Sequence, residues 1–185
     1  MAISNEKKSA DIIDVYHGST YLFEEIDTDK GKPYKDFGLG FYVTKSRNHA
    51  ISLALRNKRI EIKRHYPDCN AYLYTFGFDI NEAKKFKIKE FKNADIEWLQ
   101  FVISNRKIRS RSHDYDIVMG PTANDDTMAV INVYFEEMYG EIGSWDALNT
   151  LLKYIKPEVL PYQIYFGCNE AAVLLKQKGK PEVLL

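Results

Sequence analysis

The segment from residue 71 to residue 80 constrains the fold of this chain more than any other part of the sequence. Large apolar side chains stand at every second position, namely Tyr72, Tyr74, Phe76, Phe78 and Ile80. Side chains alternate between the two faces of a β-strand, whereas one face of a helix recurs every three to four residues. The segment is therefore predicted to be a strand.

Shorter patterns complete the expected secondary structure. Apolar runs predict further strands at residues 12–17, 40–44, 115–119 and 160–166. Helical spacing predicts helices at residues 45–58, 93–104, 126–139, 144–155 and 169–178, with N-caps at Ser144 and at Thr44 or Ser46. Strands and helices do not alternate regularly, so a doubly wound parallel sheet is not expected. The prediction is a single α+β domain at residues 12–180, with two small sheets, peripheral helices and an N-terminal tail at residues 1–11.

Length, composition and charge limit the class of protein and the kinds of partner that this chain could bind. At 185 residues the chain fits one domain with a sizeable core, and a hydrophobic fraction of 45% argues against disorder. The 26 basic and 26 acidic side chains cancel, so overall charge favours neither nucleic acid nor a membrane surface. Cysteines are too few for a disulfide framework, no apolar run is long enough for a membrane span, and the polar N-terminus lacks a signal-peptide core. We therefore expect a cytoplasmic protein.

Two short segments place an imidazole and a phenol next to glycines. Tyr16-His17-Gly18-Ser19 ends the first expected strand, and Gly38-Leu39-Gly40-Phe41-Tyr42-Val43-Thr44 spans the second. Glycine lets a flat ligand approach the main chain, and an aromatic ring offers that ligand a stacking surface. Structural interpretations also exist, because local backbone can satisfy His17 and Tyr42 can fill a core. The combination predicts a pocket for a flat ring such as nicotinamide.

These segments resemble the first two motifs of the His-Tyr-Glu ADP-ribosyltransferases, which include the diphtheria-toxin-like and poly(ADP-ribose) polymerase-like enzymes. Two later segments are similar to a bacterial branch of that superfamily known only as a domain of unknown function: Tyr115-Asp116-Ile117-Val118-Met119-Gly120-Pro121-Thr122-Ala123-Asn124-Asp125-Asp126-Thr127 and Gln163-Ile164-Tyr165-Phe166. The resemblance spans roughly residues 12–176. It implies that residues 12–180 form an ADP-ribosyltransferase-like domain of split mixed β-sheets.

The resemblance also implies roles in binding NAD as a co-substrate, with no metal. His17 would hydrogen-bond a ribose hydroxyl, while the main chain of Gly18, beside Ser19, would hold the nicotinamide carboxamide. Tyr42 would stack on the nicotinamide ring. Thr44 would either cap the next helix or touch the carboxamide.

The third motif departs from the family pattern. The family has a glutamate at the start of a late strand, where it supports an oxocarbenium-like transition state through its negative charge. Here that position is Gln163. Three interpretations remain open: Gln163 suffices by positioning, a carboxylate from Asp125 or Asp126 (or, less favoured, Glu158) substitutes, or NAD binds without efficient turnover. Asp125 and Asp126 also have a structural interpretation as helix caps.

The expected function follows from the resemblance. It implies a NAD-dependent mono-ADP-ribosyltransferase that modifies an unidentified protein or nucleic acid, in the role of a bacterial toxin or defence effector with an antitoxin-like partner. The alternative is a catalytically weak or inactive module that binds NAD, ADP-ribose or a protein. Basic clusters at residues 56–64 and 106–111 would favour an acidic target if they flank the pocket.

Overall fold

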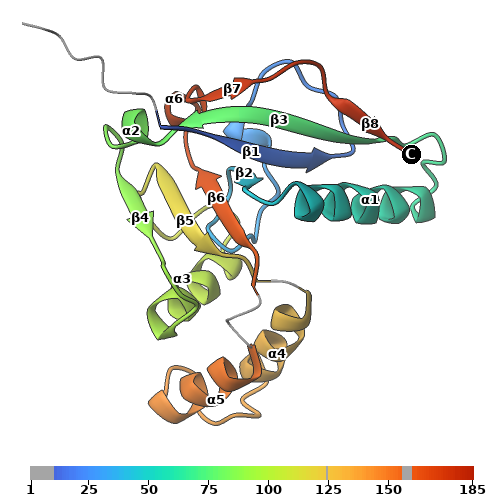
Figure 1. The fold of residues 1–185 in the computed structure, drawn as a ribbon. Helices are drawn as coiled ribbons and strands as arrows, with labels where there is room; N and C mark the ends of the chain where they lie inside the picture. Colours follow the sequence, from blue (N-terminus) through green and yellow to red (C-terminus); the bar gives the residue numbers. More distant parts are fainter. Residues whose placement is uncertain (1–10, 124, 156–159) are drawn as a thin grey trace, which may run out of the picture.

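The computed structural model describes residues 11–123, 125–155 and 160–185, so the expected tail lies almost wholly outside the described residues (Figure 1). The fold is mixed α+β. The strands are β1 (Ile12–Ser19), β2 (Phe41–Thr44), β3 (Ala71–Asp79), β4 (Ile88–Glu90), β5 (Ile117–Pro121), β6 (Tyr162–Phe166), β7 (Leu175–Gln177) and β8 (Glu182–Leu184). The helices are η1 (Thr28–Lys30), α1 (Arg47–Lys63), α2 (Ile80–Ala83), α3 (Ile96–Arg106), α4 (Asp125–Phe135), α5 (Trp145–Ile155) and α6 (Asn169–Ala172). Across these ranges, no helix is long and apolar enough to cross a bilayer.

The strands form one curled, mixed sheet in the order β4-β5-β6-β2-β1-β3-β7, with β8 also paired to β3. In Figure 1, β1, β3, β7 and β8 run across the top, whereas β4, β5 and β6 descend steeply below them. The two groups meet at β1 and β2, which share a single register pair, Tyr16 with Thr44. The two separate small sheets expected from the sequence are therefore two halves of one sheet, joined by a minimal contact.

Three apolar clusters fix the helices on this sheet. Beside the β1 and β3 half, Ala50 and Ala54 of α1 pack against Ala71 and Leu73 of β3. On the other half, α3, α4 and α5 enclose the largest cluster, which contains Trp98, Leu99, Val118, Ile131, Leu148, Leu151 and Tyr165. A third cluster joins the halves and includes Val15, Phe41, Val43, Tyr74, Phe76, Phe78, Ile164 and Phe166. Residues 71–79 form the expected strand, and these aromatic side chains explain why.

Local details differ from the sequence expectation in several places. The helix expected at residues 169–178 is wrong, because α6 ends at Ala172 and the chain then pairs with β3 as β7. Hydrogen bonding across that edge outweighs helical spacing over such a short segment. Helix α1 continues to Lys63, and β4 was not expected at all. The N-caps are confirmed, since Ser46 Oγ accepts from His49 N–H and Ser144 Oγ from Ala147 N–H.

Candidate functional site

A cavity of about 960 Å³ opens where β1 and β2 separate. Its walls come from these two strands, the segment between them, α1, the C-terminal end of α3, the residues that follow β5, the start of α4 and the start of β6. Its size lies at the upper end of the range typical of small-molecule sites. The cavity brings together the expected site residues whose side chains are described: His17, Gly18, Ser19, Tyr42, Thr44 and Gln163.

His17 is held in one orientation by its neighbours. Its ring stacks on Phe41 with a centroid distance of 4.4 Å, and its Nδ1 lies 2.7 Å from the carbonyl oxygen of Tyr42. A carbonyl only accepts, so Nδ1 carries the proton and Nε2 is the acceptor of the neutral ring. Burial lowers the pKa of His17 to about 4, and the hydrogen bond to Tyr42 opposes this only in part. The imidazole is therefore neutral near pH 7, with an acceptor atom left for a ligand hydroxyl.

The lowered pKa of His17 predicts a pH dependence of stability. The pKa of His17 is about 4 in the folded chain and 6.5 in the unfolded chain. Between these two pH values, His17 is protonated in the unfolded chain and neutral in the folded one. The contribution is therefore complete above pH 6.5 and is lost as the pH falls toward 4, up to about 3 kcal/mol at about 1.4 kcal/mol per pKa unit. Denaturant titrations of wild type and His17→Gln should show a shallower acid decline in the variant. The exposed-histidine variant His65→Asn controls for the loss of a histidine, and equal slopes for all three proteins would contradict the assignment.

Tyr42 lines the cavity but packs against other aromatic side chains than His17 does. Its hydroxyl donates to the carbonyl oxygen of Gly38 at 2.6 Å and accepts from the N–H of Phe37 at 3.1 Å. Its ring lies 5.2 Å from the ring of Tyr165, whereas His17 packs against Phe41. Burial, followed by the charge of Asp36, raises the pKa of Tyr42 well above its usual value. The phenol therefore stays protonated and anchors the turn before β2, while its ring forms part of the cavity wall.

The space beside Gly18 and Gly40, where a side chain would lie, is filled by other residues of the protein. A Cβ on Gly18 would lie 2.1 Å from the carbonyl oxygen of Ala50 in α1, and one on Gly40 would lie 2.3 Å from the Tyr165 ring. Close packing against α1 is therefore the structural reason for glycine at position 18. The backbone of Gly18 still borders the cavity, because β1 and β2 are no longer paired there.

Gly18→Ala is accordingly expected to destabilise the fold itself. The obstacle is helix backbone, which cannot rotate away as a side chain can, so a loss of about 3 kcal/mol or more is expected. Gly77→Ala in the neighbouring strand is the matched control, because its Cβ would meet only side-chain atoms of Lys178 and Ile12, at 3.0 and 3.2 Å. Urea unfolding of both variants measures the difference, and a Gly18→Ala protein as stable as Gly77→Ala would contradict the packing account.

The hydroxyl groups of Ser19 and Thr44 are already engaged within the protein. Ser19 Oγ accepts from the N–H of Tyr21 at 3.0 Å. Thr44 Oγ1 donates to the carbonyl oxygen of Tyr162 at 2.8 Å and accepts from the N–H of Ser46 at 3.2 Å. Thr44 was expected either to cap the next helix or to touch the carboxamide. Ser46 caps α1 instead, and the Thr44 hydroxyl connects β2 to β6. Both residues shape the cavity wall.

Asp36 is a buried carboxylate among the residues that line the cavity. Its residue surface is only 4% exposed, yet it lines the cavity beside Gln163. Arg106 Nε donates to Oδ1 at 2.7 Å, and Gln163 Nε2 donates to Oδ2 at 2.9 Å. Oδ2 also accepts from Ala123 N–H at 2.9 Å and from Thr122 Oγ1 at 3.1 Å. One buried carboxylate thus joins the segment before β2, the C-terminal end of α3, the end of β5 and the start of β6.

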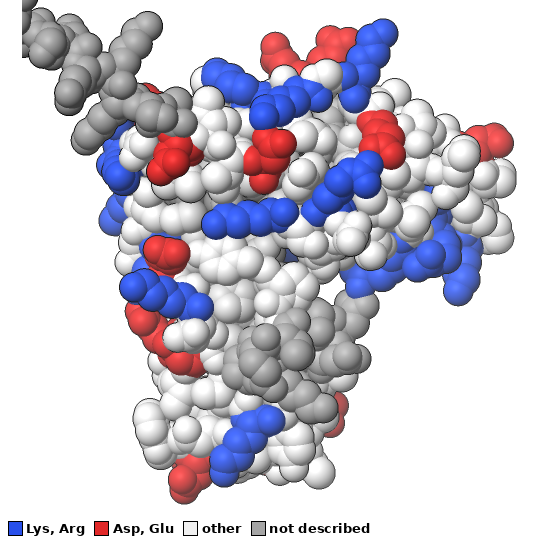
Figure 2. Space-filling view, viewed as in Figure 1, with Lys and Arg blue, Asp and Glu red and all other residues white. Residues whose placement is uncertain are grey.

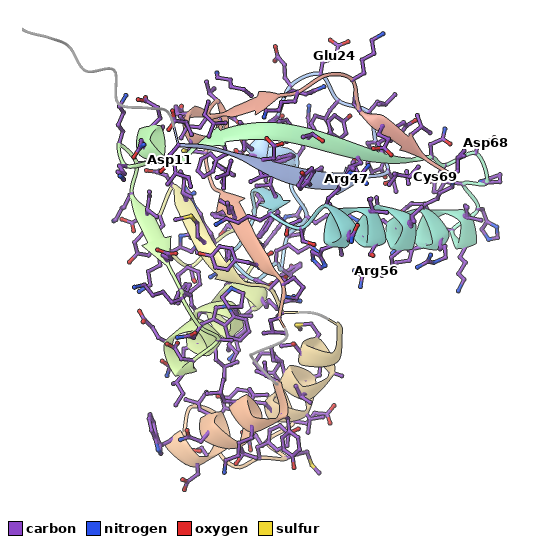
Figure 3. The ribbon with its side chains drawn as sticks, in the orientation of Figure 1. Asp11, Glu24, Arg47, Arg56, Asp68 and Cys69 are labelled. Carbon is purple, nitrogen blue, oxygen red and sulfur yellow. The ribbon has the colours of Figure 1, made fainter. Side chains whose placement is uncertain are left out.

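Basic side chains exceed acidic ones around the cavity. Among the described lining residues, the bases are Lys30, Lys32, Lys35, Arg56 and Arg106, and the acids are Glu25, Asp27 and Asp36. Burial lowers the pKa of Lys35, partly offset by Asp36. Figure 3 shows Arg56 directed away from α1, and in Figure 2 basic side chains gather below α1 while both signs alternate over much of the visible face. An anionic ligand would be favoured at this side.

The comparisons with known proteins identify a family whose function is unknown. Residues 13–177 match the model of a family described as "Protein of unknown function (DUF3990)". The chain belongs to this family. No curated protein and no solved structure matches it. For this DUF3990 protein, function must therefore be inferred from the cavity and its chemistry.

Sequence reasoning missed the carboxylate and the guanidinium of this DUF3990 cavity. Asp36 belongs to an irregular polar segment, and Arg106 was grouped with a basic cluster. No periodicity marks a contact between residues 36, 106 and 163, which only the folded sheet brings together. The three carboxylates proposed as substitutes for the missing glutamate, Asp125, Asp126 and Glu158, have side chains outside the described residues.

Proposed function

We propose that this protein is a NAD-dependent mono-ADP-ribosyltransferase. The observation that carries the proposal is the convergence of His17, Tyr42 and Gln163 on one cavity at the point where β1 and β2 separate. These residues come from three different segments of the sequence that resemble successive motifs of the His-Tyr-Glu enzymes. Aromatic side chains and an excess of basic groups among the lining residues suit a flat nicotinamide ring linked to an anionic pyrophosphate.

In the proposed reaction the glycosidic bond between nicotinamide and ribose breaks, and nicotinamide leaves with the bonding electron pair. The acceptor nucleophile forms the new bond to the ribose carbon and loses its proton, so ADP-ribosylated acceptor, nicotinamide and a proton are the products. His17 Nε2 accepts a hydrogen bond from a ribose hydroxyl. The Gly18 backbone holds the carboxamide, and Tyr42 forms the wall against the nicotinamide ring. Gln163 Oε1 accepts a hydrogen bond from a second ribose hydroxyl, next to the ribose carbon that develops positive charge.

The proposal is transfer of a single ADP-ribose unit to a protein or nucleic acid in the bacterial cytoplasm. Position 163 has an amide, so the full negative charge of the family's glutamate is absent there, and chain elongation is not proposed. The same amide favours a second candidate function, a module that binds NAD or ADP-ribose without turnover. An effector role opposed by an antitoxin-like partner belongs to the first candidate.

The two candidates are separated by nicotinamide release and transfer. Purified wild-type protein is incubated with NAD, with and without bacterial lysate, and released nicotinamide is quantified by chromatography while modified macromolecules are sought by mass spectrometry. Release that increases with lysate, together with ADP-ribosylated products, is the expected result. Saturable NAD binding without any release in lysate would support the binding module and contradict the transferase.

A further inference from the structure

We propose that Asp36 is a positioning residue for Gln163, so that the carboxylate and the amide act together where the family has one glutamate. This inference rests on the proposed function and adds to it a residue that no sequence motif contains. Its basis is the 2.9 Å hydrogen bond from Gln163 Nε2 to Asp36 Oδ2, at the wall of the cavity.

The surroundings of Asp36 decide which end of the amide faces it. Thr122 Oγ1, Ala123 N–H and the Arg106 guanidinium all donate to the carboxylate, which accepts from each of them. An amide turned by 180° would place Gln163 Oε1 against Oδ2, two acceptors with no proton between them. The nitrogen therefore faces Asp36, and Gln163 Oε1 is left for a ligand in the cavity.

The charge of Asp36 also changes the chemistry of that oxygen. A hydrogen bond from an N–H to a carboxylate is stronger than one between neutral groups, and it polarises the amide toward its oxygen. Oε1 thereby becomes a stronger acceptor for a sugar hydroxyl. At the same time the amide is fixed in one rotamer, which keeps Oε1 directed at the reacting centre.

The proposal makes glutamate unfavourable at position 163 in this chain. Gln163→Glu would place a second carboxylate within hydrogen-bonding distance of Asp36, and two such groups cannot both be ionised without strong repulsion. One proton would then be shared, with an apparent pKa that belongs to the pair and is raised. Other charged or titratable groups facing the pair are Arg106 from α3, Lys35 from the segment before β2 and Tyr42 from β2.

The test compares wild type, Gln163→Glu, Asp36→Asn and the double variant Asp36→Asn/Gln163→Glu. Nicotinamide release from NAD is measured from pH 5.5 to 8.5, and thermal unfolding is followed over the same range without NAD. Gln163→Glu should lose on the order of tenfold or more in kcat at pH 8, with a smaller loss at pH 5.5. The double variant should be more active than Gln163→Glu at pH 8, because only one carboxylate then remains in the pair, even though the amide nitrogen at position 36 would meet the Ala123 N–H where Oδ2 accepts in the wild type.

Unfolding separates this proposal from the proposed function. A raised pKa in the folded Gln163→Glu protein makes its stability fall, relative to wild type, as the pH rises above the ordinary carboxyl range. Asp36→Asn leaves Arg106 without its carboxylate and is expected to be poorly stable, alone and in the double variant, so the comparison of Gln163→Glu with wild type across the pH range is decisive. A Gln163→Glu protein as active and as stable as wild type at pH 8 would overturn this proposal alone. A wild-type protein that neither binds nor cleaves NAD would overturn the proposed function.

Discussion

Replacing Tyr42 with alanine is expected to reduce nicotinamide release from NAD by about 100-fold or more, the size of effect that follows when a reacting group is no longer held in place. The ring forms a wall of the cavity, and its hydroxyl ties down Phe37 and Gly38 next to Asp36. Loss of both features would free the nicotinamide and the segment that carries the carboxylate. Release is measured by chromatography at a temperature where the variant remains folded by circular dichroism.

Two matched variants separate the ring from general loss of packing. Tyr42→Phe keeps the ring and removes the hydroxyl, so it should retain release within about tenfold while losing about 1–3 kcal/mol of stability from the unpartnered backbone groups. Phe101→Ala removes a half-buried aromatic from the same cluster, near Phe37 but outside the cavity lining. If Phe101→Ala lost release as severely as Tyr42→Ala, Tyr42 would have only a packing role.

Arg106→Ala is expected to cost about 3–5 kcal/mol of folding free energy, because removal of one partner leaves a buried charge without compensation. The side chains of Arg106 and Asp36 are only 17% and 5% exposed. For a chain of this length the melting temperature should fall by roughly 10 °C or more. Differential scanning calorimetry measures the change directly, and NAD-dependent release should fall with it if Asp36 positions Gln163 as proposed.

The exposed ion pair of Arg47 with Glu182 supplies the control. Its side chains are 47% and 54% exposed, so Arg47→Ala should cost no more than about 1 kcal/mol. An Arg106→Ala protein that melts within a degree or two of Arg47→Ala would show that the Asp36 cluster contributes little to the fold.

The elements predicted correctly are those whose residues carry a local signal. Strand β3 follows from aromatic side chains at every second position, and the start of α1 follows from Ser46, whose hydroxyl caps it. Strand β7 could not be predicted, because its stability comes from pairing with β3, about a hundred residues earlier. The single register pair between β1 and β2 is likewise a property of the whole sheet.

The candidate site divides in the same way. His17, Tyr42 and Gln163 stand in recognisable segments, and the cavity contains all of them. At Gly18 the structure adds a packing reason for glycine, since the space beside it is filled by Ala50 of α1; the role expected for its main chain stays a prediction. Asp36 was invisible because its partners are Arg106 and Gln163, whose contacts with it exist only in the folded chain.

The central claim, that this cavity binds NAD through its nicotinamide half, is tested most directly by titration calorimetry with NAD. Saturable one-to-one binding to wild type is expected, with at least about tenfold weaker binding to Tyr42→Ala and unchanged binding to Phe101→Ala. An absence of saturable binding to folded wild-type protein, or equal affinity in all three proteins, would contradict it.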